Sequence, residues 1–275
     1  MNTSNRIPLN KQLAYAATIS CRIDDGAHIG AVVLAAGESS RMQGIDKIYY
    51  PLGGVPLVWH SIAAFLSHPM IEDIVLVTSA SNMGQAVEVI EENGASGVVK
   101  LCEGGERRQD SVHRGLQLLD DCEYIVVHDG ARPFVSADII DKGIAASKEH
   151  GAAVAAVPVK DTIKMSDKIL DGEHTVAQTL PRDRLWAVQT PQIFRASLLA
   201  EAHRRVSHRV TDDASMVEAI GNPVRLFHGS YYNIKVTTPE DLLFANAIVA
   251  GGLSGIASMD RTLNAVSAAQ SGSGE

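Results

Sequence analysis

A turn of small residues near the N-terminus is the first feature whose residue types could do chemistry. The apolar run 30–36 (GAVVLAA) is followed by GESSRM at 37–42. Successive backbone N–H groups in such a turn can bind phosphate oxygens, and Arg41 and Lys47 add two cations. The spacing matches neither GxxxxGK[ST] nor GxGxxG, which disfavours a P-loop ATPase and a dinucleotide-dependent dehydrogenase. An exposed turn with two surface cations stays open as the alternative.

An acidic residue ends another apolar run. Asp129 follows residues 124–128 (YIVVH). A carboxylate at the end of a buried strand is costly unless it meets a metal ion, a cation or a substrate hydroxyl. None of the ten His residues has a metal-ligand spacing such as HExxH, and His128 is expected to be an oriented core histidine rather than a base. Asp129 is therefore the functional candidate of this run.

Alternating strands and helices must position these residues. Short apolar runs predict strands, and apolar residues three and four apart predict the helices between them. The predicted strands are 30–36, 74–78, 124–127 and 152–159, and the predicted helices are 57–66, 84–92, 109–119 and 136–150, with Ser136 as a helix N-cap. This order predicts an α/β fold with a mostly parallel sheet flanked by helices, whose ligands bind beyond the carboxyl ends of the strands. The loops after Ala36, Leu101 and Val127 are thus expected to form the site.

The second half of the chain departs from this alternation of strands and helices. Residues 160–184 are polar and rich in turn formers, too long for an ordinary connection, yet they contain β-forming residues. We therefore expect a protruding β-hairpin arm. Further predicted elements are strand 186–188, helix 196–206, a helix opened by Thr211, strands 224–227 and 234–236, and a last helix with Thr238 as N-cap and Pro239 in its first turn.

The composition is that of a globular protein, with 45% hydrophobic and 20% charged residues among 275. A net charge of −8 gives no basic field, so neither nucleic acid nor a membrane is expected as a partner. Cys21, Cys102 and Cys122 lack CxxC spacing, which favours inert thiols in a reducing cytoplasm over disulfides or a zinc site. Residues 1–27 are expected to be a flexible extension without a signal peptide, 28–250 the functional domain, and 251–275 a disordered tail.

Six motifs, in order, resemble the 2-C-methyl-D-erythritol 4-phosphate cytidylyltransferase family. They are AAGESSRM (35–42) with Lys47, EGGERRQDSV (103–112), VHDGARP (127–133), QTPQIF (189–194), TDDASMVE (211–218) and NIKVTTPEDL (233–242). The resemblance implies a Rossmann-like nucleotidyltransferase fold and a Mg²⁺-dependent homodimer joined by the arm. It also implies transfer of CMP from CTP to methylerythritol 4-phosphate, with release of pyrophosphate, in non-mevalonate isoprenoid synthesis.

The matching positions imply a role for each candidate residue. Arg41, Lys47 and Lys235 would bind phosphates in the transition state, while Asp129 would contact the alditol hydroxyls or a metal ion. Residues that would bind the nucleotide are Leu34, Ala35, Ala36, Gly37, Gly104, Gly105, Glu106, Ser111 and Gly130. Residues that would bind the alditol phosphate are Arg132, Thr190 and Thr211 from one chain, with Thr162 and Arg182 reaching across from the arm of the neighbouring chain.

Plainer structural roles remain open at several positions. The glycines at 104 and 105 are also typical of a turn before a helix capped by Asp110 or Ser111. Thr211 could act as a helix N-cap, Arg132 could anchor the arm through an ion pair, and Lys235 could protect a sheet edge.

Two further alternatives concern the nucleotide loop and the activity. The spacer between Arg41 and Lys47 departs from the family pattern, and an ion pair of Asp46 with Lys47 could restrain the amine until nucleotide arrives. The rival functions are a pentitol phosphate cytidylyltransferase that uses ribitol 5-phosphate, and a non-catalytic nucleotide-binding regulator.

Overall fold

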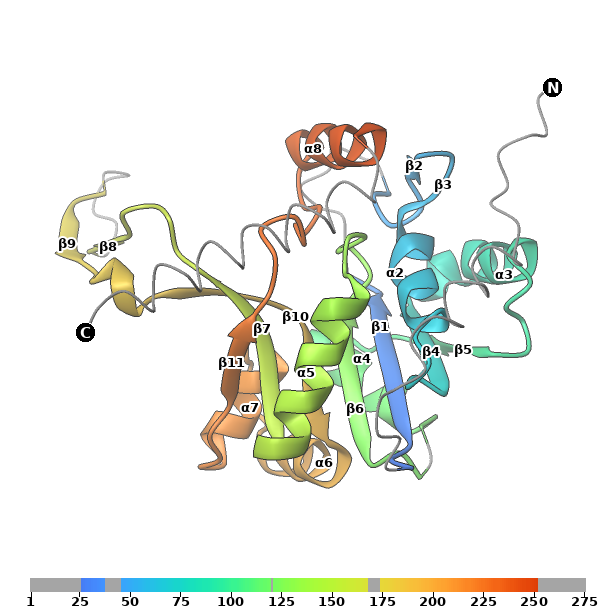
Figure 1. Ribbon diagram of the computed structural model, residues 1–275, viewed down its shortest axis with the longest axis horizontal. Coiled ribbons are helices and arrows are strands. Elements are labelled where there is room, and N and C mark those ends of the chain that lie inside the picture. The colour runs from blue at the N-terminus through green and yellow to red at the C-terminus, as the bar shows by residue number, and fades with distance from the viewer. Residues whose placement is uncertain (1–25, 38–45, 120, 168–173, 252–275) are drawn as a thin grey trace.

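The computed structural model describes residues 26–37, 46–119, 121–167 and 174–251. Arg41, Cys21 and nearly all of the predicted extension and tail lie outside these residues. The core is a seven-stranded sheet in the order β11-β7-β10-β6-β1-β4-β5 (Figure 1). Its strands are β1 (Ile29–Ala35), β4 (Asp73–Thr78), β5 (Val99–Glu103), β6 (Tyr124–Asp129), β7 (Ala152–Pro158), β10 (Trp186–Arg195) and β11 (Arg225–His228). In this sheet β10 runs antiparallel to both of its neighbours and the other pairings are parallel, which confirms the predicted mostly parallel sheet.

Helices cover both faces of this sheet, as the buried apolar strands require. One face packs against α2 (Leu57–Leu66), α3 (Met83–Glu92) and α5 (Ala137–His150), and the other against α4 (Arg108–Leu116), α6 (Ala196–Arg205) and α7 (Asp213–Ala219). Successive residues of β1 alternate between the two cores: Val33 packs into the first and Val32 into the second.

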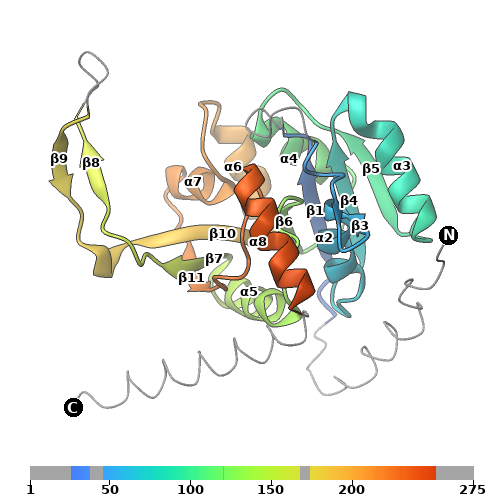
Figure 2. The same ribbon diagram turned by 90° about the horizontal axis from the view of Figure 1, so that it is seen from above.

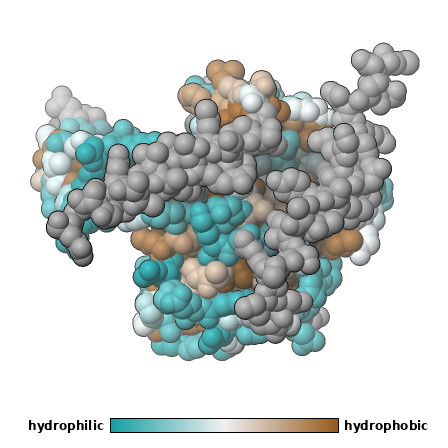
Figure 3. All heavy atoms as spheres, viewed as in Figure 1, coloured by the Kyte–Doolittle hydropathy of each residue, from teal (hydrophilic) through white to brown (hydrophobic). Residues whose placement is uncertain are grey.

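A third small core lies at one end of the sheet. There α8 (Pro239–Ala250) packs on the short hairpin of β2 (Pro51–Leu52) and β3 (Val55–Pro56), with Val236 buried beneath it. Leu243 and Phe244 of α8 remain 72% and 64% exposed, and the apolar surface over α8 is visible at the top of Figure 3. Within the described residues, no helix is long and apolar enough to cross a membrane.

The predicted arm is present as a hairpin of β8 (Lys164–Ser166) and β9 (Val176–Thr179), which projects from the body (Figure 2). Both of its strands are exposed, including Met165 and Val176. A 3₁₀ turn (Arg182–Arg184) leads from the arm into β10, and another (Ala80–Asn82) precedes α3. Dimerisation through the arm stays a prediction.

Several predicted caps and one predicted strand are corrected. Residues 234–236 belong to no strand, and Val236 N–H bonds to Ala131 O outside any ladder. The N-cap of α7 is Asp212, whose carboxylate accepts from Ser215 N, and not Thr211. The N-cap position of α4 is Arg107 and not Asp110 or Ser111. The caps Ser136 and Thr238 are confirmed, with Pro239 in the first turn of α8.

Candidate active site

The carboxyl ends of three strands bring the predicted loops together. Leu34 of β1 lies opposite Asp129 of β6, and Gly130 N–H bonds to Leu34 O over 2.8 Å. Gly104, after β5, bonds through its N–H to Thr78 O at the end of β4. A Cβ atom at Gly130 would come within 3.0 Å of Leu34 O, so a glycine permits this close approach. The loops expected to hold the site are therefore adjacent.

Asp129 is buried at this edge and is surrounded by three cations. Its carboxylate lies 2.7 Å from Lys235 Nζ, 3.6 Å from Arg108 Nη2 and 3.8 Å from Arg132 Nε. Burial alone would raise the pKa of Asp129, but Lys235, then Arg108 and Arg132, hold it well below its ordinary value. The carboxylate is thus ionised, and Lys235, with a side chain 41% exposed, remains reachable from outside.

Arg108 was not singled out from the sequence, although it lies within the EGGERRQDSV motif. Its guanidinium spans Asp129 and Asp213, with Nη1 2.5 Å from Asp213 Oδ2. Burial opposes the charge of both partners, yet each stabilises the other: the pKa of Asp213 is lowered and that of Arg108 is raised. Asp213 Oδ1 also lies 3.7 Å from His203 Nε2. We call Asp129, Arg108, Arg132, Lys235 and Asp213 the Asp129 cluster.

The hydroxyl of Thr190 positions Asp129 from β10. It accepts a hydrogen bond from Asp129 N over 3.0 Å and lies 3.0 Å from His128 Nδ1. Burial lowers the pKa of His128 to about 4, so the ring is neutral. Because Nε2 faces Arg132 O at 3.1 Å, this nitrogen carries the proton, and Thr190 donates to Nδ1. Thr190 is therefore engaged in holding the cluster, and His128 is the oriented core histidine that was predicted.

The segment 233–236 belongs to no sheet, but it holds Lys235 beside Asp129. Asn233 is fully buried, donates to Thr190 O over 2.8 Å and accepts from Arg132 Nη1 over 2.7 Å. Arg132 therefore bonds within the site, and the suggestion that it anchors the arm is wrong. Lys235 likewise serves no sheet edge, because its amine pairs with Asp129.

The second glycine loop has a fixed shape beside the first. Ser111 Oγ accepts from Gly105 N over 3.0 Å, and Arg114 Nη1 donates to Gly104 O over 2.9 Å. A Cβ atom at Gly104 would lie 2.4 Å from Ala36 Cβ, and so this loop lies against the residue that directly follows β1. Glu106 is exposed at its tip. The residues predicted to bind nucleotide, from Leu34 to Gly37 and at 104–111, thus line one edge.

Lys47 is 8% exposed and lies in the loop that leads to β2. The carboxylate of Asp46 accepts from Ile48 N over 3.1 Å and from Asn82 Nδ2 over 2.6 Å. These bonds hold Asp46 in the loop, and the restraint of Lys47 by Asp46 stays a hypothesis.

Two of the predicted substrate residues lie in the arm rather than at the Asp129 cluster. Thr162 is exposed, and Arg182 donates to Lys160 O over 2.8 Å within the arm, which extends away from the body (Figure 2). Thr211 is exposed beside Ser215 at the start of α7. A single chain therefore does not bring Thr162 and Arg182 to the cluster.

The donor set around Asp129 does not fit a metal ion held by the protein alone. Mg²⁺ favours several oxygen ligands, whereas Asp129 faces one ammonium and two guanidinium groups. Among the described residues, the grouping of potential metal ligands that the side chains form lies elsewhere, at His28, Asp73 and Cys122. The predicted assignment of Asp129 as a resident metal ligand is therefore not favoured.

Comparisons with known proteins agree with this architecture. Residues 29–251 match the family described as 2-C-methyl-D-erythritol 4-phosphate cytidylyltransferase. A relative of that name from Dehalococcoides mccartyi is 48% identical over 224 residues, which cover 82% of this chain and 97% of the relative. One from Geobacillus thermodenitrificans is 46% identical, covering 80% of this chain and 96% of the relative.

Solved structures lead to the same family. The 4-diphosphocytidyl-2C-methyl-D-erythritol synthase of Anaerococcus prevotii superimposes with a TM-score of 0.72 at 31% identity, covering 82% of this chain and 97% of that one. The 2-C-methyl-D-erythritol 4-phosphate cytidylyltransferase of Thermus thermophilus has a TM-score of 0.65 at 33% identity, covering 80% and 98%. The chain therefore belongs to the 2-C-methyl-D-erythritol 4-phosphate cytidylyltransferase family.

Proposed function

We propose that this chain is a nucleotidyltransferase that transfers CMP from CTP to 2-C-methyl-D-erythritol 4-phosphate, with release of pyrophosphate, in non-mevalonate isoprenoid synthesis. The names of its relatives support the substrate. The observation that carries the proposal is the buried, ionised Asp129 held among Lys235, Arg108 and Arg132 beside two glycine loops. This places fixed positive charge where two polyanions would have to meet.

The chemistry requires electrostatic help rather than proton transfer. A phosphate oxygen of the alditol phosphate attacks the α-phosphorus of CTP, the new P–O bond forms, and the bond to pyrophosphate breaks with its electron pair leaving on pyrophosphate. The incoming phosphate is already anionic at neutral pH, so a general base is not needed. Lys235, with Arg41 and Lys47 from the first loop, would stabilise the charge that builds on the transferring group.

The two glycine loops supply the proposed nucleotide site. Backbone groups at 104–106 and the hydroxyl of Ser111 would read the base, while the turn after β1 would hold the triphosphate. A site built around the 4-amino group of cytosine leaves a polar atom unpaired with uracil, which favours CTP over UTP. Arg132, Thr190 and Thr211 remain the proposed alditol phosphate residues, with Thr190 acting through Asp129.

Magnesium would reach this site with CTP as part of the substrate complex. The three cations around Asp129 leave that carboxylate poorly suited to hold Mg²⁺ by itself, so no step is assigned to a resident ion. When bound to the triphosphate, the ion neutralises phosphate charge. Titration of the protein with Mg²⁺ should show binding only when CTP is present.

We further propose a homodimer in which each arm completes the site of the other chain. The support is the hairpin, which projects from the body and exposes Met165 and Val176, together with exposed Thr162 and Arg182 in the segments that join it to the body. Arg182 would bind the alditol phosphate of the partner. A cytoplasmic location is proposed from the free thiols of Cys102 and Cys122.

Pyrophosphate release tests the function directly. The enzyme is supplied with CTP, Mg²⁺ and either 2-C-methyl-D-erythritol 4-phosphate or ribitol 5-phosphate, and initial rates are compared. A preference for the first confirms the proposed substrate, whereas a preference for ribitol 5-phosphate replaces it and keeps the reaction type. Nucleotide binding without release from either substrate would indicate the regulatory alternative.

A further inference from the structure

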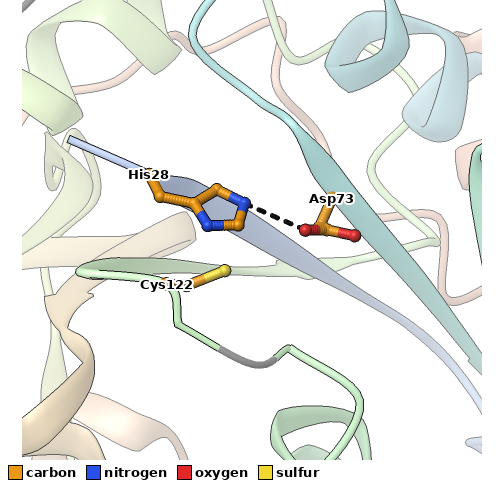
Figure 4. Close-up of side chains that lie close together, drawn as sticks. All are labelled: His28, Asp73 and Cys122. Atoms are coloured by element: carbon orange, nitrogen blue, oxygen red, sulfur yellow. Dashed lines mark hydrogen bonds and ion pairs between the residues drawn. The ribbon is translucent and has the colours of Figure 1, made fainter. Parts of the chain in front are cut away.

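A second group of chemically versatile side chains lies at the opposite edge of the sheet. His28 directly precedes β1, Asp73 begins β4, and Cys122 lies two residues before β6 (Figure 4). These three strands are neighbours in the order β6-β1-β4, with Ile29 opposite Tyr124 and Gly30 opposite Asp73. Asp129 ends the same β6 strand that begins next to Cys122, so a full strand separates this group from the active site.

The three side chains converge on one point. His28 Nε2 lies 2.9 Å from Asp73 Oδ2, and one ligand atom from each residue falls within 4.8 Å of the others. A Cβ atom at Gly30 would lie 2.8 Å from Cys122 Sγ, and so the glycine leaves room for the thiol to face the group. Backbone bonds from Glu72 N to Ile29 O and from Glu123 N to His28 O hold the adjoining segments together.

An imidazole nitrogen, a thiolate sulfur and a carboxylate oxygen are the donors that zinc takes in proteins. Tetrahedral zinc with bonds of about 2.0–2.3 Å separates its ligand atoms by roughly 3.3–3.8 Å. Side-chain movements of about an ångström would bring the three ligand atoms to that spacing. Metal binding would displace the thiol proton of Cys122 to solvent.

The surroundings are compatible with a cation. Asp73 has a cationic partner in Lys100, whose Nζ lies 2.8 Å from Oδ1, and a metal ion would take the place of the contact between Oδ2 and His28 Nε2. Glu72 Oε2 lies 4.0 Å from His28 Nε2 and offers an additional carboxylate. His28 and Asp73 are 30% and 24% exposed, so an ion can enter from solvent while Cys122 stays buried.

We propose that His28, Asp73 and Cys122 form a structural site for zinc or a similar soft divalent cation, with Glu72 or water as the fourth ligand. The spacing of the cysteines in the sequence does not indicate this site, because its three ligands lie far apart in the chain, at the starts of three different strands. A bound ion would link the starts of β6, β1 and β4, and would raise the stability of the sheet without entering the catalytic edge.

Cobalt provides the decisive probe, because Co²⁺ replaces zinc and a thiolate bound to it absorbs in the near ultraviolet. The full-length, untagged chain is treated with chelator and titrated with Co²⁺, then with Zn²⁺. We expect one Co²⁺ per chain, the sulfur-to-cobalt absorption band, loss of the band on addition of Zn²⁺, and a higher melting temperature with Zn²⁺.

Matched variants assign the ligands. Cys122→Ser should abolish the band, and His28→Gln should weaken Co²⁺ binding by more than the roughly 10–100-fold that changes around a metal site cost. Cys102→Ser and Cys21→Ser should keep both the band and the affinity. Circular dichroism without metal checks that Cys122→Ser is folded, with Cys122→Ala as the second variant.

The proposal is overturned if the wild-type chain shows no band, if the band survives in both Cys122 variants, or if it disappears with Cys102 or Cys21 instead. Pyrophosphate release is measured on the same samples. Because the group lies at the other end of β6, the rate should be the same with and without Zn²⁺, and a failed metal titration would leave the proposed reaction untouched.

Discussion

The Asp129 cluster and the arm differ in where their charged side chains lie: those of the cluster are largely buried, and those of the arm are exposed. In the cluster, Asp129 and Asp213 are buried, and their partners Arg108, Arg132 and Lys235 come from three separate parts of one chain. In the arm, Arg182 and Lys164 are exposed and donate to Lys160 O and Thr179 Oγ1, both nearby arm atoms. The cluster is therefore complete within one chain, whereas the proposed role of the arm residues requires a second chain.

Replacing Arg108 by Met should cause the largest loss of stability. The change leaves Asp213 buried without its closest cation and removes one of the cations beside Asp129. Removing one partner of a buried ion pair costs about 3–5 kcal/mol. We expect the free energy of unfolding from urea denaturation to fall by that amount.

Arg107→Met is the matched control. Arg107 is the preceding residue, but its pair with Asp110 is exposed, so stability should stay close to wild type. Adding Asp213→Asn to Arg108→Met should restore part of the loss. Equal stability of the Arg107 and Arg108 variants would refute the structural role given to Arg108.

Lys235→Met should have the next largest effect, on turnover. The amine is the closest cation to Asp129 and remains exposed to substrate. Loss of one group that stabilises transition-state charge costs about 10²–10³ in rate, or roughly 3–4 kcal/mol. The measurement is kcat for pyrophosphate release per folded protein.

Lys164→Met supplies the control from the arm, where the amine donates to Thr179 Oγ1. Its kcat should remain near wild type. If the two lysine variants lost activity equally, the distinction between cluster and arm would fail.

Acidification should weaken the interior of the cluster through His128. The pKa of the folded residue is lowered by burial to about 4, below the unfolded value of 6.5. Since the unfolded chain binds a proton first, the contribution is intact above about pH 6.5 and is lost as pH falls toward 4. This one group should cost roughly 2–3 kcal/mol between about pH 7 and about pH 4.5.

The check is the pH dependence of urea unfolding in wild type and His128→Gln. The variant should show a shallower loss of stability over that range. Identical slopes in wild type and His128→Gln would show that His128 does not carry the effect.

The smallest effect concerns the arm and tests whether sites are shared. Arg182→Ala and Lys47→Ala chains should each be weakly active alone. If each arm serves the partner, random mixing makes half of the dimers mixed, each with one intact site, and restores about a quarter of wild-type activity. No gain on mixing, measured after denaturation and refolding of the two chains together, would mean that each chain carries its own site.

Much of the fold could be predicted from local pattern. The apolar runs and the caps Ser136 and Thr238 located β1, β4, β6, β7, α5 and α8 to within a few residues. The prediction of a strand at 234–236 is wrong because alternating apolar residues also occur in segments outside a sheet, here one held by a bond from Val236 N to Ala131 O.

Site residues could be predicted where a sequence motif marks their loop. They could not be predicted where their role depends on which side chain is buried. Asp129 and Lys235 were expected at the site, and their contact agrees with that expectation. Arg108 was missed because two adjacent arginines look alike in sequence, although one is exposed and the other reaches Asp213. Nothing local to TDDAS shows that the side chain of its second aspartate, Asp213, is fully buried.

The arm leaves the sheet between two strands that are already hydrogen-bonded to each other. Val159 N bonds to Leu185 O, and Pro158 lies opposite Trp186, so the two ends of the excursion emerge side by side. A connection closed at its base in this way can be lengthened, exchanged or replaced by a tight turn without disturbing the strands below it. The hydrogen bonding of β7 and β10 at the base therefore does not depend on the length of the arm.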